Sequence, residues 1–412
     1  MTRTPSRRTG VRRYACVLTV AAALAAAGCS APDTGTKNDG SSGAGTAVPD
    51  KPSKPQVINV VDVAGNLQLT QGILDDFAKA HPDIVSKFVT TTATAPQLPP
   101  KIKAEQDAGR LDIDLVLTGT DALAAGIAQN LWLKLTPDHN SKLPALNDVY
   151  TDDAKKMQEL AQGYGVVVTE YPAGPLIEYN PKTVPNPPTT VEELLAYAKA
   201  HPQKVEWAQP RNSGPARTLL MGLPYILGDS NPKDPATWDK TWAYLAELAP
   251  YQPAYPGGTT QTMKDLANGT VDIIASTTGW DINPRALGTV PADMKVGTLS
   301  GFHWITDAHY MVVPKGIDKD KLSAILNLMK FALQPKEQAI TFDKGYFYPG
   351  PAVKGVTIDM APQASQDVIK QFGRPEYDGL ISSHPKETSL PADAQVKAYD
   401  LWDQKVGSVA KK

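Results

Sequence analysis

The chain has 412 residues, and 41 Lys and Arg against 43 Asp and Glu give it a formal net charge of −2. Because acids and bases are interspersed, we expect no nucleic-acid partner. The length suits two lobes better than one core. Both cysteines, Cys16 and Cys29, lie near the N-terminus. The remaining chain therefore has no disulfide and no catalytic or metal-binding thiolate.

The N-terminal residues have the order of an export signal. Four arginines between positions 7 and 13 precede an apolar run at 17–27, and small residues then lead to Cys29. Residues 26–29 (AAGC) resemble the lipobox of bacterial lipoproteins, although Ala26 stands where that motif usually has leucine. The resemblance implies a lipoprotein signal peptide at 1–28 and lipidation of Cys29. The alternative is an uncleaved anchor, for which the run falls short of the ~20 apolar residues of a membrane span.

Residues 29–55 have the composition of a tether. They are mostly Gly, Ser, Thr, Ala, Asp and Pro, with almost no large apolar side chain. Such a segment has too little apolar surface to bury, so we predict a flexible connection between the anchor and a folded body.

Strands and helices alternate in the first part of the body. The patterns predict strands at 57–63, 84–90 and 112–117 and helices at 69–80, 101–108 and 122–129. Strands that alternate with helices are typical of parallel βαβ units, so we predict an α/β lobe.

The later elements are separated by longer loops. We predict strands at 166–168, 271–275 and 310–313 and helices at 190–200, 238–248, 263–267, 321–333 and 396–406. Thr190 and Glu193 have the spacing of a capping box at the start of a helix. The sequence YPAGP at 171–175 is expected to end the strand before it.

Eight short stretches have an order and spacing along the chain that can be compared with known families. They are 74–77 (LDDF), 114–116 (DLV), 179–181 (YNP), 188–195 (PTTVEELL), 269–272 (GTVD), 302–307 (FHWITD), 311–316 (MVVPKG) and 330–339 (KFALQPKEQA). In order and spacing they resemble the extracellular solute-binding proteins (family 1) of bacterial ABC importers, nearest the spermidine/putrescine branch. The resemblance covers most of the chain after the tether.

The resemblance implies a two-lobed α/β fold of the periplasmic-binding-protein type II. Lobe 1 would comprise 56–168 and 307–345, and lobe 2 would comprise 169–306 and 346–412, with hinge strands between them. A small solute would bind in the cleft and be enclosed by hinge closure. The resemblance further implies a monomer on the extracytoplasmic face of the cell membrane, an ABC permease as partner, and no cofactor.

Two tryptophan–acid pairs are candidates for binding, the first on lobe 2 and the second on the segment expected to cross back to lobe 1. Trp280 and Asp281 follow the strand near 271–276, and polyamine-type relatives carry a tryptophan at the corresponding place. Trp304 and Asp307 repeat the pairing, but Asp307 lies one residue later than in the family pattern, which reverses the side-chain direction on an extended segment. An aromatic face beside a carboxylate suits an organic cation. The alternative is that Trp280 packs and Asp281 caps a turn.

The cleft loops of lobe 1 fit a polyamine less well. The resemblance places Asp62, Asn66, Thr118, Thr120 and Asp121 there, where the polyamine branch carries aromatic residues and an acid.

Lobe 2 departs from the polyamine pattern as well. Thr218 stands in the place of a ligand-binding acid of that branch. Ser213 and Arg217 lie at the start of a predicted helix, with Arg211 just before it, and helix N-termini favour negative charge. The alternative is that Ser213 only caps the helix and both arginines are solvated. An organic cation, a sugar, a thiamine-like compound and an anionic or zwitterionic solute all stay open as ligands.

Two further patterns bear on the chemistry of the site. The aromatic loop at 346–350 is expected to pack in the core or the hinge. The six histidines are scattered without metal-ligand spacing, so we expect no metal site.

The sequence favours a binding protein over an enzyme. It has no G-x-S-x-G elbow and no cysteine nucleophile. The rival hypothesis is a lipid-anchored extracellular hydrolase, because a Ser-His-Asp set scattered along the chain stays open.

Overall fold

The computed structural model describes residues 47–63 and 65–408, and a compact body begins at Val48. The expected signal peptide, Cys29 and the tether up to residue 46 lie outside the described residues. Among the residues described, no helix has the length and apolar character needed to cross a membrane.

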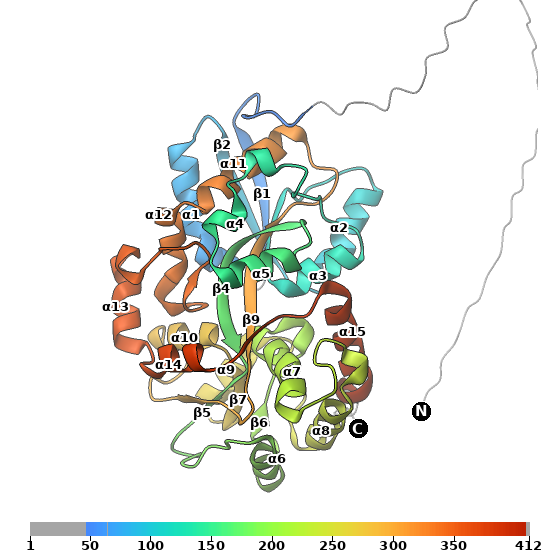
Figure 1. The fold of residues 1–412 in the computed structure, drawn as a ribbon, viewed down its shortest axis with the longest axis vertical. Helices are drawn as coiled ribbons and strands as arrows, with labels where there is room; N and C mark the ends of the chain where they lie inside the picture. Colours follow the sequence, from blue (N-terminus) through green and yellow to red (C-terminus); the bar gives the residue numbers. More distant parts are fainter. Residues whose placement is uncertain (1–46, 64, 409–412) are drawn as a thin grey trace, which may run out of the picture. The chain divides into compact units, whose positions relative to one another are not determined.

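The body contains strands in two sheets and helices around them (Figure 1). The strands are β1 (Gln56–Val63), β2 (Val85–Ala93), β3 (Leu115–Thr118), β4 (Gly165–Gly174), β5 (Leu176–Tyr179), β6 (Val205–Glu206), β7 (Ile273–Ser276), β8 (Lys295–Gly297), β9 (Trp304–Val312), β10 (Gly350–Pro351) and β11 (Lys386–Thr388). The helices are α1 (Asn66–Ala80), α2 (Leu98–Asp107), α3 (Thr120–Ala128), α4 (Leu146–Val149), α5 (Asp152–Leu160), α6 (Val191–Ala200), α7 (Gly214–Leu227), α8 (Asp239–Leu248), α9 (Thr259–Ala267), α10 (Ile282–Ala286), α11 (Lys319–Ala332), α12 (Pro335–Gln338), α13 (Gln363–Phe372), α14 (Glu376–Ser383) and α15 (Ala392–Trp402).

Each sheet has its own apolar core. The larger sheet has the order β10-β4-β9-β3-β1-β2, with β11 beside β9, and we name it with its core the first lobe. The smaller sheet has the order β6-β7-β5-β8, and with its core it forms the second lobe. In the first lobe β1 pairs in parallel with β2 and β3, as βαβ units require. The predicted α/β class is confirmed.

Two long strands, β4 and β9, connect the lobes (Figure 1). The prediction that 171–175 ends the strand at 166–168 is wrong, because β4 continues to Gly174. The register against β9 shifts between Pro172 and Gly174, and a proline without an N–H is tolerated at such an irregularity.

β9 begins earlier than the predicted strand at 310–313. All nine of its residues are buried, including Thr306, Asp307 and His309. These polar residues interrupt the apolar pattern, so the sequence alone predicts only the last part of the strand.

The last residues of the expected tether pack against the body. Pro52 is buried, Lys51 pairs with Asp83 at 2.6 Å, and Ser53 N–H donates to Asp320 at 3.0 Å. The expectation of a flexible segment up to residue 55 is therefore wrong for residues 48–55.

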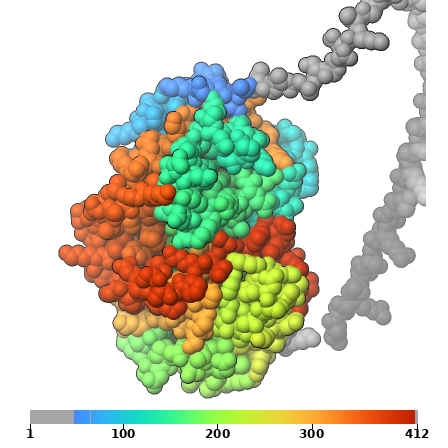
Figure 2. Space-filling model, viewed as in Figure 1, coloured from blue at the N-terminus to red at the C-terminus, as the bar shows by residue number. Residues whose placement is uncertain are grey.

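The last part of the chain contacts both lobes. Ala352 and Val353 pack in the first core, although we expected 346–412 in lobe 2, because β10 pairs with β4. Tyr399 and Trp402 of α15 pack in the second core. Figure 2 shows this part of the chain, orange to dark red, as a band across the face between the two lobes.

A buried carboxyl on β4 makes stability depend on pH. Glu170 is 7% exposed, and its Oε2 has no hydrogen-bond partner. Burial, with a smaller contribution from Asp153, raises its pKa to about 7. The folded protein thus retains a proton that the unfolded chain releases near pH 4.5.

We therefore expect Glu170 to stabilise the fold fully below pH 4.5, and this contribution to be lost as pH rises through 7. The loss is at most about 3–4 kcal/mol, since one pKa unit corresponds to ~1.4 kcal/mol. Urea denaturation at pH 5 and pH 8 measures it. Glu170→Gln should lose less stability over this interval, and an identical pH dependence in both proteins would refute the assignment.

Candidate functional site

A cavity of about 270 Å³ lies in the cleft between the two lobes. The first lobe contributes the C-terminal end of β2 and the starts of α1 and α3, and the second lobe contributes the starts of α7 and α9. β4, β9 and the segment before β10 complete the wall. The lining residues are Gly65, Ala93, Thr94, Asp121, Tyr171, Asn212, Gly214, Arg217, Gly258, Thr259, Thr260, Trp280, His309, Tyr346 and Phe347.

Carboxylates accept hydrogen bonds from backbone N–H groups at two helix starts of the first lobe. Asp62, at the end of β1, accepts the N–H of Leu67 in α1 at 3.0 Å. Burial raises the pKa of Asp62 to about 6, against the opposing effect of the backbone N–H donors of Leu67 and Asn66. In α3, Asp121 accepts the N–H of Ala122 at 2.8 Å. Both helix N-termini thus already have an acid beside them.

The helix starts in the second lobe differ from each other. Ser213 caps α7 by accepting the N–H of Ala216 at 3.3 Å. α9 follows Gly258 and has no side-chain cap. The Ser213 and Thr259 hydroxyl groups lie 2.8 Å apart, so a hydrogen bond joins the two helix starts.

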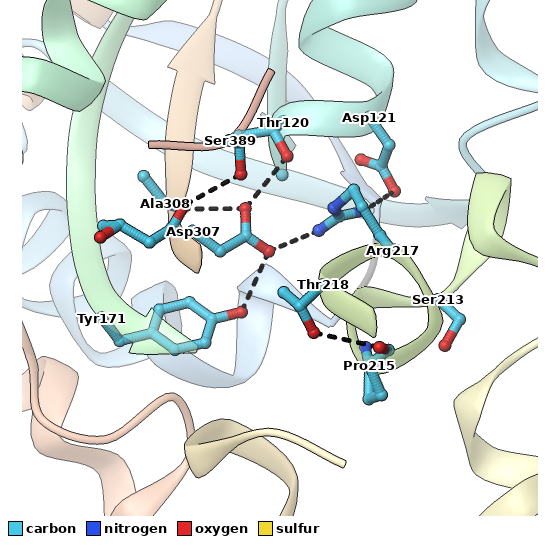
Figure 3. Close-up of polar contacts among 12 residues, drawn as sticks. Thr120, Asp121, Tyr171, Ser213, Pro215, Arg217, Thr218, Asp307, Ala308 and Ser389 are labelled. Carbon is cyan, nitrogen blue, oxygen red and sulfur yellow. Dashed lines mark hydrogen bonds and ion pairs between the residues drawn. The ribbon is translucent and has the colours of Figure 1, made fainter. Parts of the chain in front are cut away.

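A buried ion-pair cluster centred on Arg217 connects the lobes (Figure 3). Arg217 of α7 donates to Asp121 of α3 at 3.0 Å and to Asp307 of β9 at 2.5 Å. Thr120 and Tyr171 also donate to Asp307, at 3.0 and 3.3 Å. Burial would raise the pKa of Asp307, but the Arg217 charge outweighs it and holds this pKa below its ordinary value. We name these five residues the Arg217 cluster.

His309 lies beside this cluster in the wall of the cavity. It is 3% exposed, and its ring Nδ1 has no hydrogen-bond partner within the described part of the chain. Burial lowers its pKa to about 3, because Asp307 only partly offsets the loss of hydration and the nearby Arg217 adds to the effect. The imidazole is therefore neutral at pH 7.

Four aromatic rings form a continuous wall of the cavity next to His309, and we name them the aromatic wall. They are Tyr171, Trp280, Tyr346 and Phe347. Phe347 stacks on Tyr171 at 4.8 Å between centroids and contacts Tyr346 at 4.0 Å. Trp280 meets Tyr346 edge to face at 5.6 Å. Such a wall offers apolar and π contacts to a planar or apolar group.

Backbone constraints hold the aromatic wall in place. Phe347 has φ 54°, an uncommon conformation for a bulky residue that tertiary contacts must stabilise. A Cβ on Gly279 would lie 2.3 Å from the Phe347 ring, so only glycine allows the approach.

The sequence-predicted residues divide into four groups, of which the first three lie at or near the cavity. Trp280, Asp121 and Arg217 line the cavity. Thr120 and Asp307 lie behind the lining in the Arg217 cluster. The remaining cleft candidates use their side chains locally at the neighbouring turns and helix starts: Asp62, Asn66, Thr118, Ser213 and Thr218.

Asp281 and Trp304 do not line the cavity. Asp281 is fully buried and accepts from Arg285, Arg374 and Tyr377. Trp304 is buried in a satellite core against Phe302, and its ring N–H donates to the Leu380 carbonyl. The expectation that these two side chains face the cleft is wrong, because buried partners elsewhere in the fold hold them.

Several lining residues have no clear signal in the sequence. Tyr171 stands in the stretch that we expected to break a strand, and His309 stands among scattered histidines. Thr259 and Thr260 precede the helix predicted at 263–267, which in fact begins four residues earlier. We expected Tyr346 and Phe347 to pack in the core or hinge, but they also line the cavity.

Comparisons with known proteins give a family and a fold. A family model of bacterial extracellular solute-binding proteins matches residues 72–369. A search of curated proteins finds no match.

Solved structures share the two-lobed fold at low sequence identity. The spermidine/putrescine substrate-binding protein of Streptococcus pneumoniae is 15% identical, with 87% of this chain and 100% of that chain covered and a TM-score of 0.57. A fructose-6-phosphate-bound periplasmic binding protein of Actinobacillus pleuropneumoniae is 13% identical (85% and 99% covered, TM-score 0.59). A glucopine-bound binding protein of A. tumefaciens is 15% identical (86% and 100% covered, TM-score 0.60).

Proposed function

We propose, since this chain belongs to the family of bacterial extracellular solute-binding proteins, that it captures a small polar solute in the cleft and delivers it to the permease of an ABC importer. The observation that carries the proposal is the 270 Å³ cavity lined by both lobes. Ligand sites are typically concave, with apolar and aromatic walls and a few placed polar groups. The aromatic wall, the starts of α7 and α9, and Arg217 together meet this description.

The two crossing strands suggest how capture works. β4 and β9 are the main connections between the lobes, so bending near their middle would open and close the cleft. A solute that contacts both lobes binds the closed form better than the open form and therefore shifts the equilibrium towards closure. The Arg217–Asp121 ion pair joins α7 to α3 across the same cleft and would favour the closed form even before the solute binds.

The proposal includes a cellular location, which rests on the sequence. Removal of residues 1–28 and lipidation of Cys29 would hold a monomer at the extracytoplasmic face of the membrane, near its permease. In place of the hydrolase hypothesis, we propose that the protein releases its solute unchanged. Mass spectrometry of the solute after incubation separates the two, since a hydrolase would return products.

A thermal-shift screen over amines, thiamine-like cations, amino acids, sugars and organic anions tests the function. A bound solute at one hundred times its Kd should stabilise the protein by ~2.7 kcal/mol. We expect Trp280→Ala to weaken binding roughly tenfold, because it removes one ring of the aromatic wall.

Trp304→Phe is the matched control for this screen. It should lower the melting temperature of the free protein, since it removes the hydrogen bond to the Leu380 carbonyl, yet keep the solute-induced rise. If Trp304→Phe lost the rise and Trp280→Ala kept it, the cavity would not be the binding site. If no solute of any class stabilised the protein, the proposed function would fail.

A further inference from the structure

The unpaired donors of the cleft gather at the start of α9. The Thr259 and Thr260 N–H groups have no acceptor among the described residues, and neither has the Gly214 N–H at the start of α7. All three residues line the cavity. α9 spans nine residues, so its N-terminus carries the partial positive charge of a helix dipole. Unpaired N–H groups at a helix start favour an anion.

The acids of the cleft are already paired. Asp121 is the one acid among the described lining residues, and it bonds to Arg217 and to its own helix start. An ammonium group in this cavity would find no free carboxylate. It would also lie near Arg217, whose side chain is 4% exposed and whose charge is held by the Arg217 cluster. The described lining therefore offers a cation no unpaired carboxylate as counter-charge.

His309 is an independent sign of a missing partner. Its ring is buried in the cavity wall, and no group of the described chain forms a hydrogen bond with its Nδ1. Buried polar groups are nearly always hydrogen-bonded, so an unpaired one in a cavity points to a ligand. A neutral imidazole donates through one nitrogen and accepts through the other, which suits an oxygen-bearing ligand.

We infer that the captured solute carries a carboxylate or phosphate group, which binds the N–H groups of Thr259, Thr260 and Gly214, and an apolar or planar body, which lies on the aromatic wall beside His309. The inference rests on the proposed function and names the chemical class of its solute. It departs from the organic cation that the tryptophan–acid pairs in the sequence favoured, because Asp281 and Asp307 do not line the cavity and both are paired with arginines.

A charge-balanced library tests the inference. It contains equal numbers of organic anions, zwitterions with a carboxylate or phosphate, neutral sugars, and organic cations that include spermidine, each screened by thermal shift and then by isothermal titration calorimetry. We expect the tightest solutes to carry a carboxylate or phosphate. A tightest solute that is a sugar or a purely cationic amine overturns the inference while leaving the proposed function intact, whereas no solute in any class contradicts the proposed function.

Two substitutions at one position isolate the backbone donor. Thr259→Pro removes the N–H at the first position of α9, where proline is tolerated, and the extended Gly258 before it (φ −174°, ψ 167°) suits a residue preceding proline. Thr259→Val keeps the N–H. Both variants lose the hydroxyl contact with Ser213, so that loss cancels in the comparison.

With the tightest anion of the library, Thr259→Pro should bind about tenfold or more weakly than Thr259→Val, because a hydrogen bond to a charged group is lost. The melting temperatures of the two free variants show whether both are folded. Equal affinities of the two folded variants would overturn the placement of the anion at α9. Arg217 is unsuitable for this test, because its substitution is expected to destabilise the fold.

Discussion

Arg217→Met is expected to lower the free energy of unfolding by about 3–5 kcal/mol. The substitution leaves Asp121 and Asp307 without their cation, and the side chains of these acids are only 3% and 0% exposed. Breaking a buried ion pair from one side is costly, because the remaining charge has neither water nor a partner. Urea denaturation at pH 7 measures the loss.

An exposed arginine in the same region provides the matched control. Arg211 pairs with Asp400 and Asp403, and its side chain is 33% exposed. Arg211→Met should cost ~1 kcal/mol or less, since water and salt screen such pairs. Adding Asp121→Asn and Asp307→Asn to Arg217→Met should recover part of the lost stability, because no buried charge then stays unpaired. Equal losses for Arg211→Met and Arg217→Met would show that the cluster is not a desolvated ion-pair network.

Asp281→Ala is expected to cause a loss of similar size, about 3–5 kcal/mol. Asp281 accepts from Arg285 at 2.9 Å, from Arg374 at 2.6 Å and from Tyr377 at 2.6 Å. Burial would raise its pKa, but the two arginines outweigh this and hold the pKa below its ordinary value. The nearby Glu178 does not replace this charge, because burial and Asp281 raise its pKa to about 8.

The loss should begin in α13 and α14, because Arg374 and Tyr377 connect this segment to α10 through Asp281. Hydrogen exchange should therefore rise first in residues 363–383. Asp293→Ala is the control, since Asp293 pairs with Lys182 at a surface where both side chains are about half exposed or more. A global loss without faster exchange in 363–383, or an equal loss in Asp293→Ala, would contradict this role.

The local patterns located most of the secondary structure but failed where tertiary contacts replace local signals. The strand predicted at 57–63 and the helix predicted at 190–200 agree with β1 and α6, because a continuous β-branched run and a helix-capping pattern are both visible in the sequence. The sequence predicted only parts of β4 and β9, since each contains residues that are rare in strands. Pro172 lies at a register shift, and Asp307 is neutralised by an arginine 90 positions away.

The candidate site shows the same division. Arg217, Asp121 and Trp280 were identified from their positions beside strand ends and helix starts, where an α/β sheet places its ligands. Their positions in the sequence did not show which way the side chain of each acid points. Asp281 and Asp307 both follow the tryptophan pattern of a cation site, yet arginines from α7, α10 and the segment before α14 bind them. A carboxylate in a low-dielectric interior requires such a partner, and sequence order does not say which arginine will be near it.

The sequence by itself thus determined the α/β class, the succession of elements and the resemblance to solute-binding proteins, because these depend on periodicity and on order along the chain. The tertiary structure alone decided which groups remain unpaired in the cleft. Arg217 pairs with two distant acids, whereas the starts of α7 and α9 and the His309 ring keep unpaired groups within the described lining. The preference for an anion over a cation follows from that pairing, because electrostatics in a cavity depends on distances across lobes that are far apart in sequence.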